Sequence, residues 1–174
     1  MKFTDGIKLI SHPALQPGKP TQWADLGCGA GFFTNVLSSL LAKASTIYAI
    51  DEDAAAVKKV KVAEGVYLNT YTSNFIQSPF PFGVIDGIML ANALHYVRDK
   101  NNFTQKLKLH LAPGAVLLLV EYDTTNSNAW VPYPISFSVL KELCLQHGFT
   151  SIEKINQMPS AFGRSNMYAA LVTL

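Results

Sequence analysis

The segment that most constrains the fold of this chain is a run of alternating glycines, Asp25-Leu26-Gly27-Cys28-Gly29-Ala30-Gly31-Phe32. It follows an apolar stretch at residues 23–26 and precedes a helical pattern whose apolar face carries Phe33, Val36, Leu37, Leu40 and Leu41. Glycines at such a junction allow the sharp turn from strand to helix, and they leave bare N–H groups at the positive end of the helix. The turn therefore predicts a site for a nucleotide-like or carboxylate-bearing ligand.

A second strand, at residues 46–50, ends in Asp51, twenty residues after Gly31. In a βαβ unit an acidic side chain at this position can accept hydrogen bonds from ribose hydroxyls. The structural alternative is that the glycines only make a tight turn and that Asp51 only caps the helical segment beginning at Asp53. Because strand, glycines, helix, strand and acid occur in this order, a ribose-containing ligand is the favoured interpretation.

The spacing of the glycines distinguishes between ribose ligands. A dinucleotide fingerprint reads Gly-x-Gly-x-x-Gly, whereas Gly31 stands one place too early and Phe32 occupies the expected position. The pattern Asp-x-Gly-x-Gly-x-Gly, followed by Ala49-Ile50-Asp51, resembles the first motifs of class I S-adenosylmethionine (SAM) dependent methyltransferases. Residues 82–97 resemble the fourth-strand motif of that family, and residues 111–121 resemble its turn and fifth strand.

The composition is that of one small domain spanning residues 1–174, since 49% of the residues are hydrophobic and can form a sizeable core. No apolar run is long enough to cross a membrane and the first residues lack an apolar leader, so we expect no membrane partner and a cytoplasmic location. A net charge of +2 with scattered basic residues does not indicate nucleic acid. Two cysteines, Cys28 and Cys144, make neither a disulfide framework nor a metal cluster, and no metal is expected.

The order of segments after Asp51 predicts the architecture. We expect a helix at 53–63, strands at 66–68 and 84–90, a helix at 101–111 stopped by Pro113-Gly114, a strand at 115–121, a loop at 122–134, a helix at 139–147, and strands at 149–155 and 166–172. The last two strands are too close for a helical crossover and should pair antiparallel. The methyltransferase resemblance implies an α/β fold with a doubly wound, mostly parallel seven-stranded sheet that ends in this antiparallel hairpin.

The resemblance also implies SAM as the cofactor and assigns residues to its parts. Backbone of the glycine turn approaches the methionine end, Asp25 accepts from the ammonium group, and the acids after the second strand bind the ribose. Asn74 and Phe75 match the adenine-contacting position. The alternative is that Asn74 is an ordinary loop residue and Phe75 a core residue. The expected cofactor-binding residues are Asp25, Gly27, Cys28, Gly29, Gly31, Asp51, Glu52, Asn74, Phe75, Ala91 and Asn92.

Methyl transfer from a sulfonium mainly requires a close and aligned acceptor, and a base is needed only where the acceptor loses a proton. His95, just beyond the fourth strand, is the candidate base, with a loop-orienting role as the alternative. Glu121 and Tyr122 are second candidates. The loop at 122–135 is predicted to bind substrate through Tyr122, Trp130 and Tyr133 together with His95, or else to be pinned to the surface by its aromatic residues. Residues 1–20 are expected to cover the other side of the pocket.

Missing motifs narrow the acceptor. The fourth strand ends in Ala91-Asn92-Ala93-Leu94, not in the Asn/Asp-Pro-Pro-aromatic signature of nucleic acid amino methyltransferases, and the chain has no Pro-Cys pair for cytosine chemistry. A small molecule is therefore the expected acceptor, and nucleic acid is not expected as a partner. Two other functions stay open at this point, an NAD(P)-dependent Rossmann oxidoreductase and a non-catalytic SAM-binding module.

Overall fold

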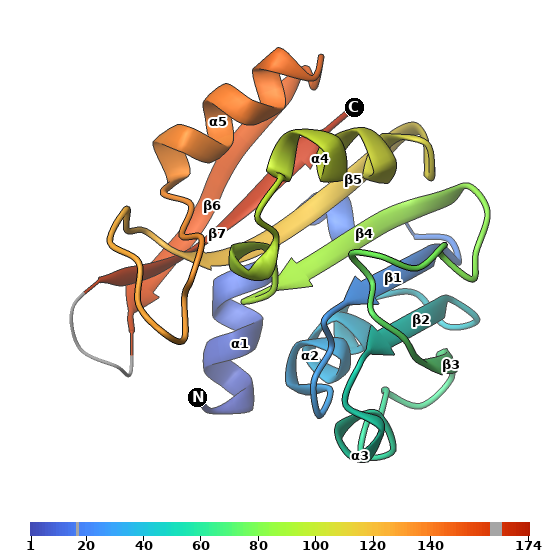
Figure 1. Cartoon of the computed structure of the whole chain (residues 1–174). Coiled ribbons are helices and arrows are strands. Elements are labelled where there is room, and N and C mark those ends of the chain that lie inside the picture. Colours follow the sequence, from blue (N-terminus) through green and yellow to red (C-terminus); the bar gives the residue numbers. More distant parts are fainter. Residues whose placement is uncertain (17, 161–164) are drawn as a thin grey trace.

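A computed structural model describes residues 1–16, 18–160 and 165–174 of the chain. Seven strands form one sheet in the order β3-β2-β1-β4-β5-β7-β6 (Figure 1). The strands are β1 (Gln22–Leu26), β2 (Thr46–Asp51), β3 (Tyr67–Thr72), β4 (Ile85–Ala91), β5 (Leu111–Tyr122), β6 (Ser151–Pro159) and β7 (Asn166–Thr173). The helices are α1 (Phe3–Ile10), α2 (Phe32–Leu40), α3 (Ala54–Val57), α4 (Lys100–Lys108) and α5 (Phe137–Gln146), with short 3-10 turns η1 (Pro13–Leu15) and η2 (Leu94–Tyr96).

The first five strands are parallel, whereas β7 pairs antiparallel with both β5 and β6. This arrangement confirms the predicted mixed sheet and its antiparallel end. The chain builds outward from β1 to β2 and β3 on one side and then continues with β4 and β5 on the other. Ligands of open α/β sheets bind at such a switch point, outside the carboxyl ends of the strands. The fold therefore places a binding crevice where β1 and β4 end.

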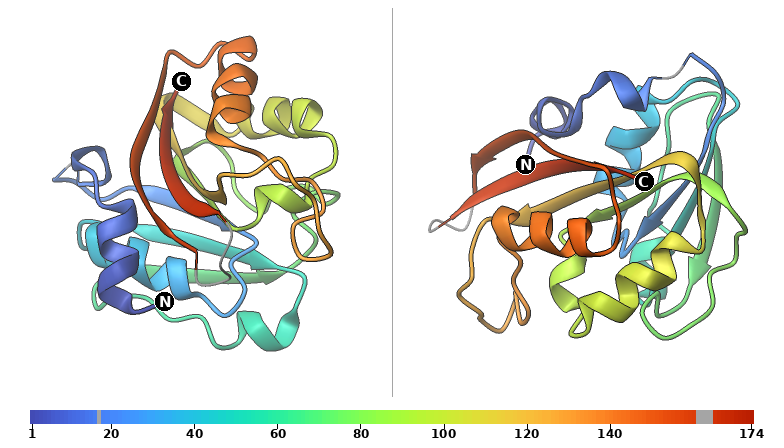
Figure 2. Two further views of the ribbon diagram at one scale, coloured as in Figure 1. Left: turned by 90° about the vertical axis from the view of Figure 1, so that its left-hand side faces the viewer. Right: turned by 90° about the horizontal axis from the view of Figure 1, so that it is seen from above.

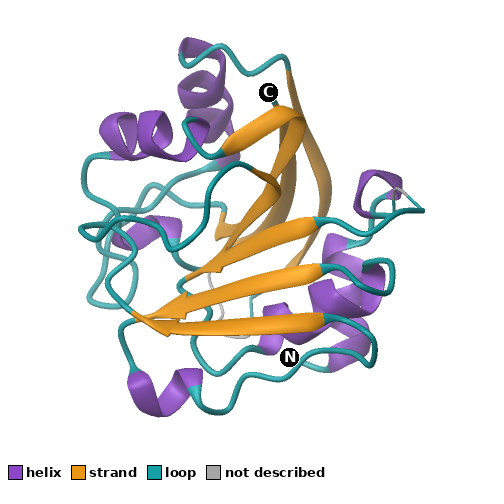
Figure 3. Cartoon of the chain, turned by 90° about the vertical axis from the view of Figure 1, so that its right-hand side faces the viewer, coloured by secondary structure: helices purple, strands orange, loops and turns teal. Residues whose placement is uncertain are grey.

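Helices cover both faces of the sheet, as a doubly wound fold requires (Figures 2 and 3). On β5, Leu117 and Leu119 belong to the core that includes residues of α4 and α5, while Leu118 and Val120 belong to the core under α1 and α2. Because successive side chains of a strand point to opposite faces, a strand buried on both sides is apolar throughout. The continuous apolar run at 115–120 is thus explained. No helix in the described ranges is long and apolar enough to cross a bilayer.

Two predicted helices have different limits. The helix expected at 53–63 ends after one turn, at Val57, and residues 60–63 run as irregular chain. There the Oγ of Ser38 accepts the N–H of Ala63 at 2.8 Å, and Val60 packs under the glycine turn, so tertiary contacts replace helical hydrogen bonds. The helix expected at 101–111 ends at Lys108. Leu111 instead pairs with Ile85, and β5 continues through Pro113 and Gly114.

The N-terminal segment, for which no helix was predicted, forms α1 on the same face as α2. The two helices approach closely at Gly6, where a Cβ atom would lie 2.8 Å from Cγ2 of Val36. At the other side of α1, the side-chain amide of Asn156 donates to the Lys8 carbonyl at 2.6 Å. The segment therefore seals one face of the sheet between α2 and β6.

Candidate functional site

A cavity of about 330 Å³ opens at the carboxyl ends of β1, β2, β3 and β4. Its volume lies at the lower end of the range for small-molecule sites. Its position is the one that the strand order predicts, because each of the four strands leads directly into a segment of its wall. The lining residues are Gly27, Asp51, Glu52, Asn74, Phe75, Ile76, Asn92, Ala93 and Tyr96.

The three glycines of the turn have left-handed φ angles for different reasons. A Cβ atom on Gly27 would lie 2.7 Å from the Ala93 Cβ, and one on Gly31 would lie 2.9 Å from the Cα of Val60, so both positions are set by packing. Gly29, with φ of 51°, would place its Cβ in open space. Gly29 thus keeps its left-handed backbone without a packing constraint on its side, and a ligand can approach its backbone closely.

The Asp51 carboxylate fastens the glycine turn to the end of β2. Oδ2 accepts the Gly29 N–H at 2.8 Å and Oδ1 accepts the Asp53 N–H at 2.9 Å. Asp53 in turn caps α3 through the N–H groups of Ala55 and Ala56. Asp51 still lines the cavity, and each carboxylate oxygen has a further lone pair for a ligand hydroxyl. The ligand-binding and structural interpretations of this residue are thus compatible.

Two buried oxygen atoms next to the cavity have no hydrogen-bond partner among the described residues, Oδ1 of Asp25 and Oδ1 of Asn92. The other Asp25 oxygen accepts the Thr34 hydroxyl at 2.6 Å. Burial raises the pKa of Asp25 from 3.8 to about 7, opposed by the Thr34 hydrogen bond. Asn92 has a left-handed φ of 54°, a conformation that costs energy in a residue other than glycine and is concentrated at functional sites. Buried polar atoms of this kind call for a hydrogen-bond partner.

The far wall of the cavity consists of residues that follow β2 and β3. The Asn74 amide nitrogen donates to the Glu52 carboxylate at 3.0 Å, while its oxygen accepts the N–H groups of Ile76 and Gln77. Phe75 lines the cavity and also packs edge-on against Phe103, with 5.8 Å between ring centroids. The amide orientation of Asn74 is therefore set by the protein, and Phe75 is both a wall residue and a core residue.

His95 lies in η2, between Ala93 and Tyr96 of the cavity wall, and is 2% exposed. Its Nδ1 lies 2.7 Å from Oε2 of Glu121, and its backbone N–H donates to the other carboxylate oxygen at 3.1 Å. Its carbonyl accepts the Tyr133 N–H at 3.0 Å. The buried pair thus links the end of β4, the end of β5 and the loop at 122–135.

The aromatic residues of that loop differ in exposure. Tyr122 packs near the His95 ring, with 6.0 Å between centroids, and its burial raises the pKa of the phenol. Tyr133 is held through its backbone, because its carbonyl accepts the Lys100 ammonium at 2.7 Å. Trp130 is 81% exposed, in a turn where the Asn128 side chain accepts the Trp130 N–H at 2.8 Å. None of the three residues lines the cavity.

The cavity contains six of the eleven residues predicted to bind cofactor, namely Gly27, Asp51, Glu52, Asn74, Phe75 and Asn92. The other five, Asp25, Cys28, Gly29, Gly31 and Ala91, lie in the same turn or strand ends without forming its wall. Sequence reasoning missed Ile76, Ala93 and Tyr96 as wall residues. Each of these residues is adjacent in sequence to a predicted site residue. The motifs therefore located the segments that form the cavity wall, but not which side chains of those segments face the cavity.

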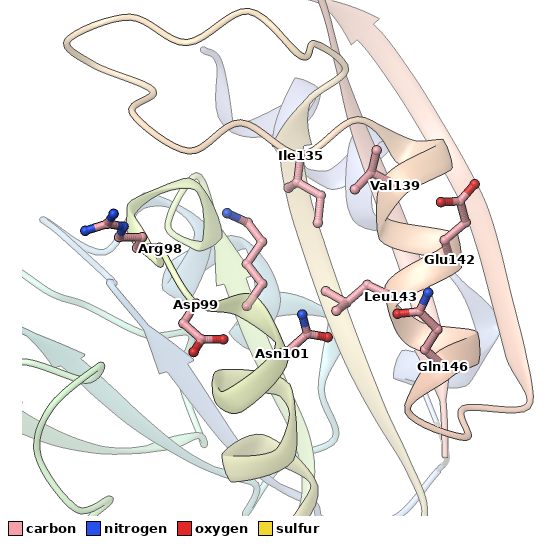
Figure 4. Close-up of a pocket in the computed structure, with 9 residues that line it drawn as sticks. Arg98, Asp99, Asn101, Ile135, Val139, Glu142, Leu143 and Gln146 are labelled. Atoms are coloured by element: carbon pink, nitrogen blue, oxygen red, sulfur yellow. The ribbon is translucent and has the colours of Figure 1, made fainter.

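A second, larger hollow of about 680 Å³ lies between the start of α4 and α5 (Figure 4). Arg98, Asp99 and Asn101 stand on one side, and Val139 and Glu142 of α5 stand on the other. It has no residue in common with the cavity at the strand ends. Gly27 of the glycine turn and Asn92, which carries one of the two unpartnered oxygens, line the smaller cavity, so the smaller cavity is the candidate site.

Comparisons with known proteins show which proteins this chain is similar to. Residues 24–119 match the profile of a family described as a methyltransferase domain. Norajmaline N-methyltransferase from Rauvolfia serpentina is 24% identical over 131 residues, which are 72% of this chain. The match covers 45% of that enzyme, so the chain spans about half the length of the curated relative.

Solved structures share the fold at low sequence identity. A putative SAM-dependent methyltransferase from Listeria monocytogenes has a TM-score of 0.69 at 14% identity, with 98% of this chain and 97% of that chain covered. The plantazolicin methyltransferase BpumL, solved with S-adenosylhomocysteine (SAH), has a TM-score of 0.68 at 14% identity, with 98% and 84% covered. These similarities extend over the whole sheet, including its antiparallel end.

Proposed function

Since this chain belongs to the methyltransferase domain family, whose profile matches residues 24–119, we propose that it transfers a methyl group from SAM to a small-molecule acceptor. The observation that carries the proposal is the pair of buried, unpartnered oxygens of Asp25 and Asn92 beside an open glycine. Donors of a bound ligand would satisfy both atoms, and Gly29 offers backbone without an obstructing side chain.

The residues of the site fit the parts of SAM. Asp25, with its unpartnered Oδ1, is proposed to bind the ammonium group, directly or through a water molecule, and the open space beside Gly29 is proposed to take the methionine end. Asp51 and Glu52 are placed for the ribose hydroxyls, and Phe75 is placed to pack against adenine. Bound SAM supplies an electrophilic methyl group on a sulfonium sulfur. The protein's part is to hold it, exclude water and align the acceptor.

The acceptor is proposed to bind beside His95, on the side of Tyr122, Trp130 and Tyr133. His95 follows β4, three residues after the wall residue Asn92, whereas Tyr122 ends β5 and Trp130 and Tyr133 lie in the loop after it. A small molecule is favoured because two similar proteins are named as methyltransferases of norajmaline and of plantazolicin.

Calorimetric titration of the protein with SAH, NAD and NADP side by side tests the proposal. We expect SAH to bind and both dinucleotides to show no binding, because the glycine spacing lacks the pyrophosphate pattern. Binding of NAD or NADP without SAH would replace the proposal by an oxidoreductase function. Binding of SAH without transfer of label from [methyl-3H]SAM to a broad set of small molecules would favour a non-catalytic SAM-binding module.

A further inference from the structure

The hydrogen-bonding groups of His95 are almost all engaged. Glu121 accepts from its backbone N–H and contacts Nδ1, and Tyr133 donates to its carbonyl. Among the described residues, Nε2 of the imidazole has no hydrogen-bond partner. The fully buried side-chain atoms without a partner are Oδ1 of Asp25 and Oδ1 of Asn92, so Nε2 keeps some contact with solvent. Nε2 is therefore the atom of the His95 ring that is available to a ligand.

Glu121 determines which nitrogen carries the proton. When Glu121 is ionised, Oε1 accepts the His95 backbone N–H and Oε2 accepts from Nδ1–H. The proton on Nδ1 leaves Nε2 with a lone pair and the capacity to accept. Both side chains are nearly fully buried, and Oε2 of Glu121 lies 2.7 Å from Nδ1, so the imidazole ring is held in one orientation.

The surroundings agree with a role in proton transfer. Tyr96, the next residue, lines the cavity, and its ring lies 4.4 Å from the His95 ring. Burial lowers the pKa of Lys100, and the charge of Glu121 opposes this shift, so the carboxylate also interacts with a nearby cation. The Lys100 ammonium itself is occupied by the carbonyls of Val97 and Tyr133. His95 is thus the group at this end of β4 with a free accepting nitrogen.

We propose that His95 accepts a proton from the methyl acceptor through Nε2, and that Glu121 is the residue that positions it. The inference rests on the proposed function and narrows the substrate class. The acceptor carries a proton on its nucleophilic atom, as in a phenol, an alcohol, a primary or secondary amine or an activated C–H group. Tertiary amines and thioethers, which have no such proton, are excluded.

The step balances as follows. The nucleophilic atom of the acceptor forms a bond to the methyl carbon, and the carbon–sulfur bond breaks with its electron pair moving to sulfur. The acceptor proton passes to Nε2, and the resulting imidazolium is stabilised by Glu121. General-base assistance of this kind contributes about 100- to 10,000-fold to a rate. No oxidant, reductant or metal takes part in the balance.

The first test uses the full chain, [methyl-3H]SAM and six probes. Phenol, benzylamine, N-methylbenzylamine and acetylacetone carry the required proton, while thioanisole and N,N-dimethylbenzylamine do not. We expect label only in the first four, with kcat reduced at least about 100-fold by His95→Asn and by Glu121→Gln, and with the Kd for SAH unchanged. Glu142→Gln, which removes an exposed carboxylate on α5, is the matched control and retains wild-type kcat. Labelling of the last two probes, or wild-type kcat in His95→Asn, overturns the proposal.

A second measurement needs no acceptor. Long-range 1H–15N spectra of the SAH-bound protein labelled at histidine report which ring nitrogen is protonated, and His95→Asn assigns the His95 signals. We expect the proton on Nδ1 in the wild type and in Glu121→Asp. In Glu121→Gln we expect it on Nε2, because a glutamine amide can donate to Nδ1. If the proton lies on Nε2 of His95 in the wild-type protein, the proposed roles of His95 and Glu121 are refuted even when SAH binds. If SAH does not bind, the proposed function itself is refuted.

Discussion

Asp51 and Gly29 are joined by a 2.8 Å hydrogen bond in which the carboxylate accepts the N–H of the glycine of the turn whose side-chain direction is open. The acid at the end of β2 thereby holds the turn after β1 in the conformation that a ligand meets. The proposed ribose recognition and the shape of the glycine turn consequently depend on the same carboxylate.

Asp51→Ala is expected to weaken SAH binding by about 1.5–3 kcal/mol, the range for hydrogen bonds to a charged group. It should also lower the free energy of unfolding by about 1–3 kcal/mol, because the N–H groups of Gly29 and Asp53 lose their acceptor. Calorimetry and chemical denaturation measure the two effects. Asp53→Ala is the control, since it removes only a helix cap and should leave the Kd for SAH unchanged. An unchanged Kd in Asp51→Ala would show that Asp51 is structural only.

Gly29→Val is expected to abolish detectable SAH binding in a protein that still folds. The backbone penalty at φ of 51° is about 1–2 kcal/mol, and the new side chain meets no protein atom. Gly18→Val is a matched control, because Gly18 has φ of 71° and equally open surroundings but precedes β1 and is not part of the glycine turn. We expect similar loss of stability in both variants and loss of binding in Gly29→Val alone. Normal SAH affinity in a folded Gly29→Val would place the ligand elsewhere.

Asp25 should make both stability and binding depend on pH. Its pKa is raised from 3.8 to about 7 in the folded protein, so the folded state holds a proton that the unfolded state releases between these values. The contribution of Asp25 is therefore complete below pH 3.8 and is lost as the pH rises to about 7. Asp25→Asn removes this dependence while keeping an acceptor for Thr34, and urea denaturation across the range measures it.

The ammonium group of SAH favours the ionised form of Asp25, so binding below pH 7 should release a proton. Titrations in phosphate and Tris buffers, which differ in ionisation enthalpy, detect the release as a difference in heat. Asp25→Asn should show no difference between the buffers and should bind SAH about 1.5–3 kcal/mol more weakly. Equal heats in the wild type would indicate that the ammonium group does not approach Asp25.

Replacing Trp130 and Tyr133 together by alanine should leave the Kd for SAH within about twofold of the wild type, a difference under 0.5 kcal/mol. The side chain of Trp130 is 81% exposed, and Tyr133 is held through backbone groups that the substitution retains. The KM for an acceptor that is turned over should rise, because both residues are assigned to the acceptor side. A large loss of SAH affinity would contradict that assignment.

Much of the fold follows from local pattern, and the remainder depends on contacts between distant segments. The glycine turn, the apolar strand at 115–120 and the short link between the last strands predicted the sheet and its antiparallel end. The early stop of α3 depends on Ser38 and on packing beneath Gly31, which no local pattern contains. Likewise, motif positions located the ends of β1, β2 and β4, but the contact between His95 and Glu121 depends on the pairing of β4 with β5.

The position of β7 has a consequence for synthesis of the protein. This strand, at residues 166–173, lies between β5 and β6, although it follows both in the chain. Until it leaves the ribosome, the strongly apolar β5 has one unpaired edge, and exposed edges of this kind promote aggregation. A nascent chain that stops before residue 166 should therefore require a chaperone or precipitate, and completion of the sheet should wait for the arrival of this strand.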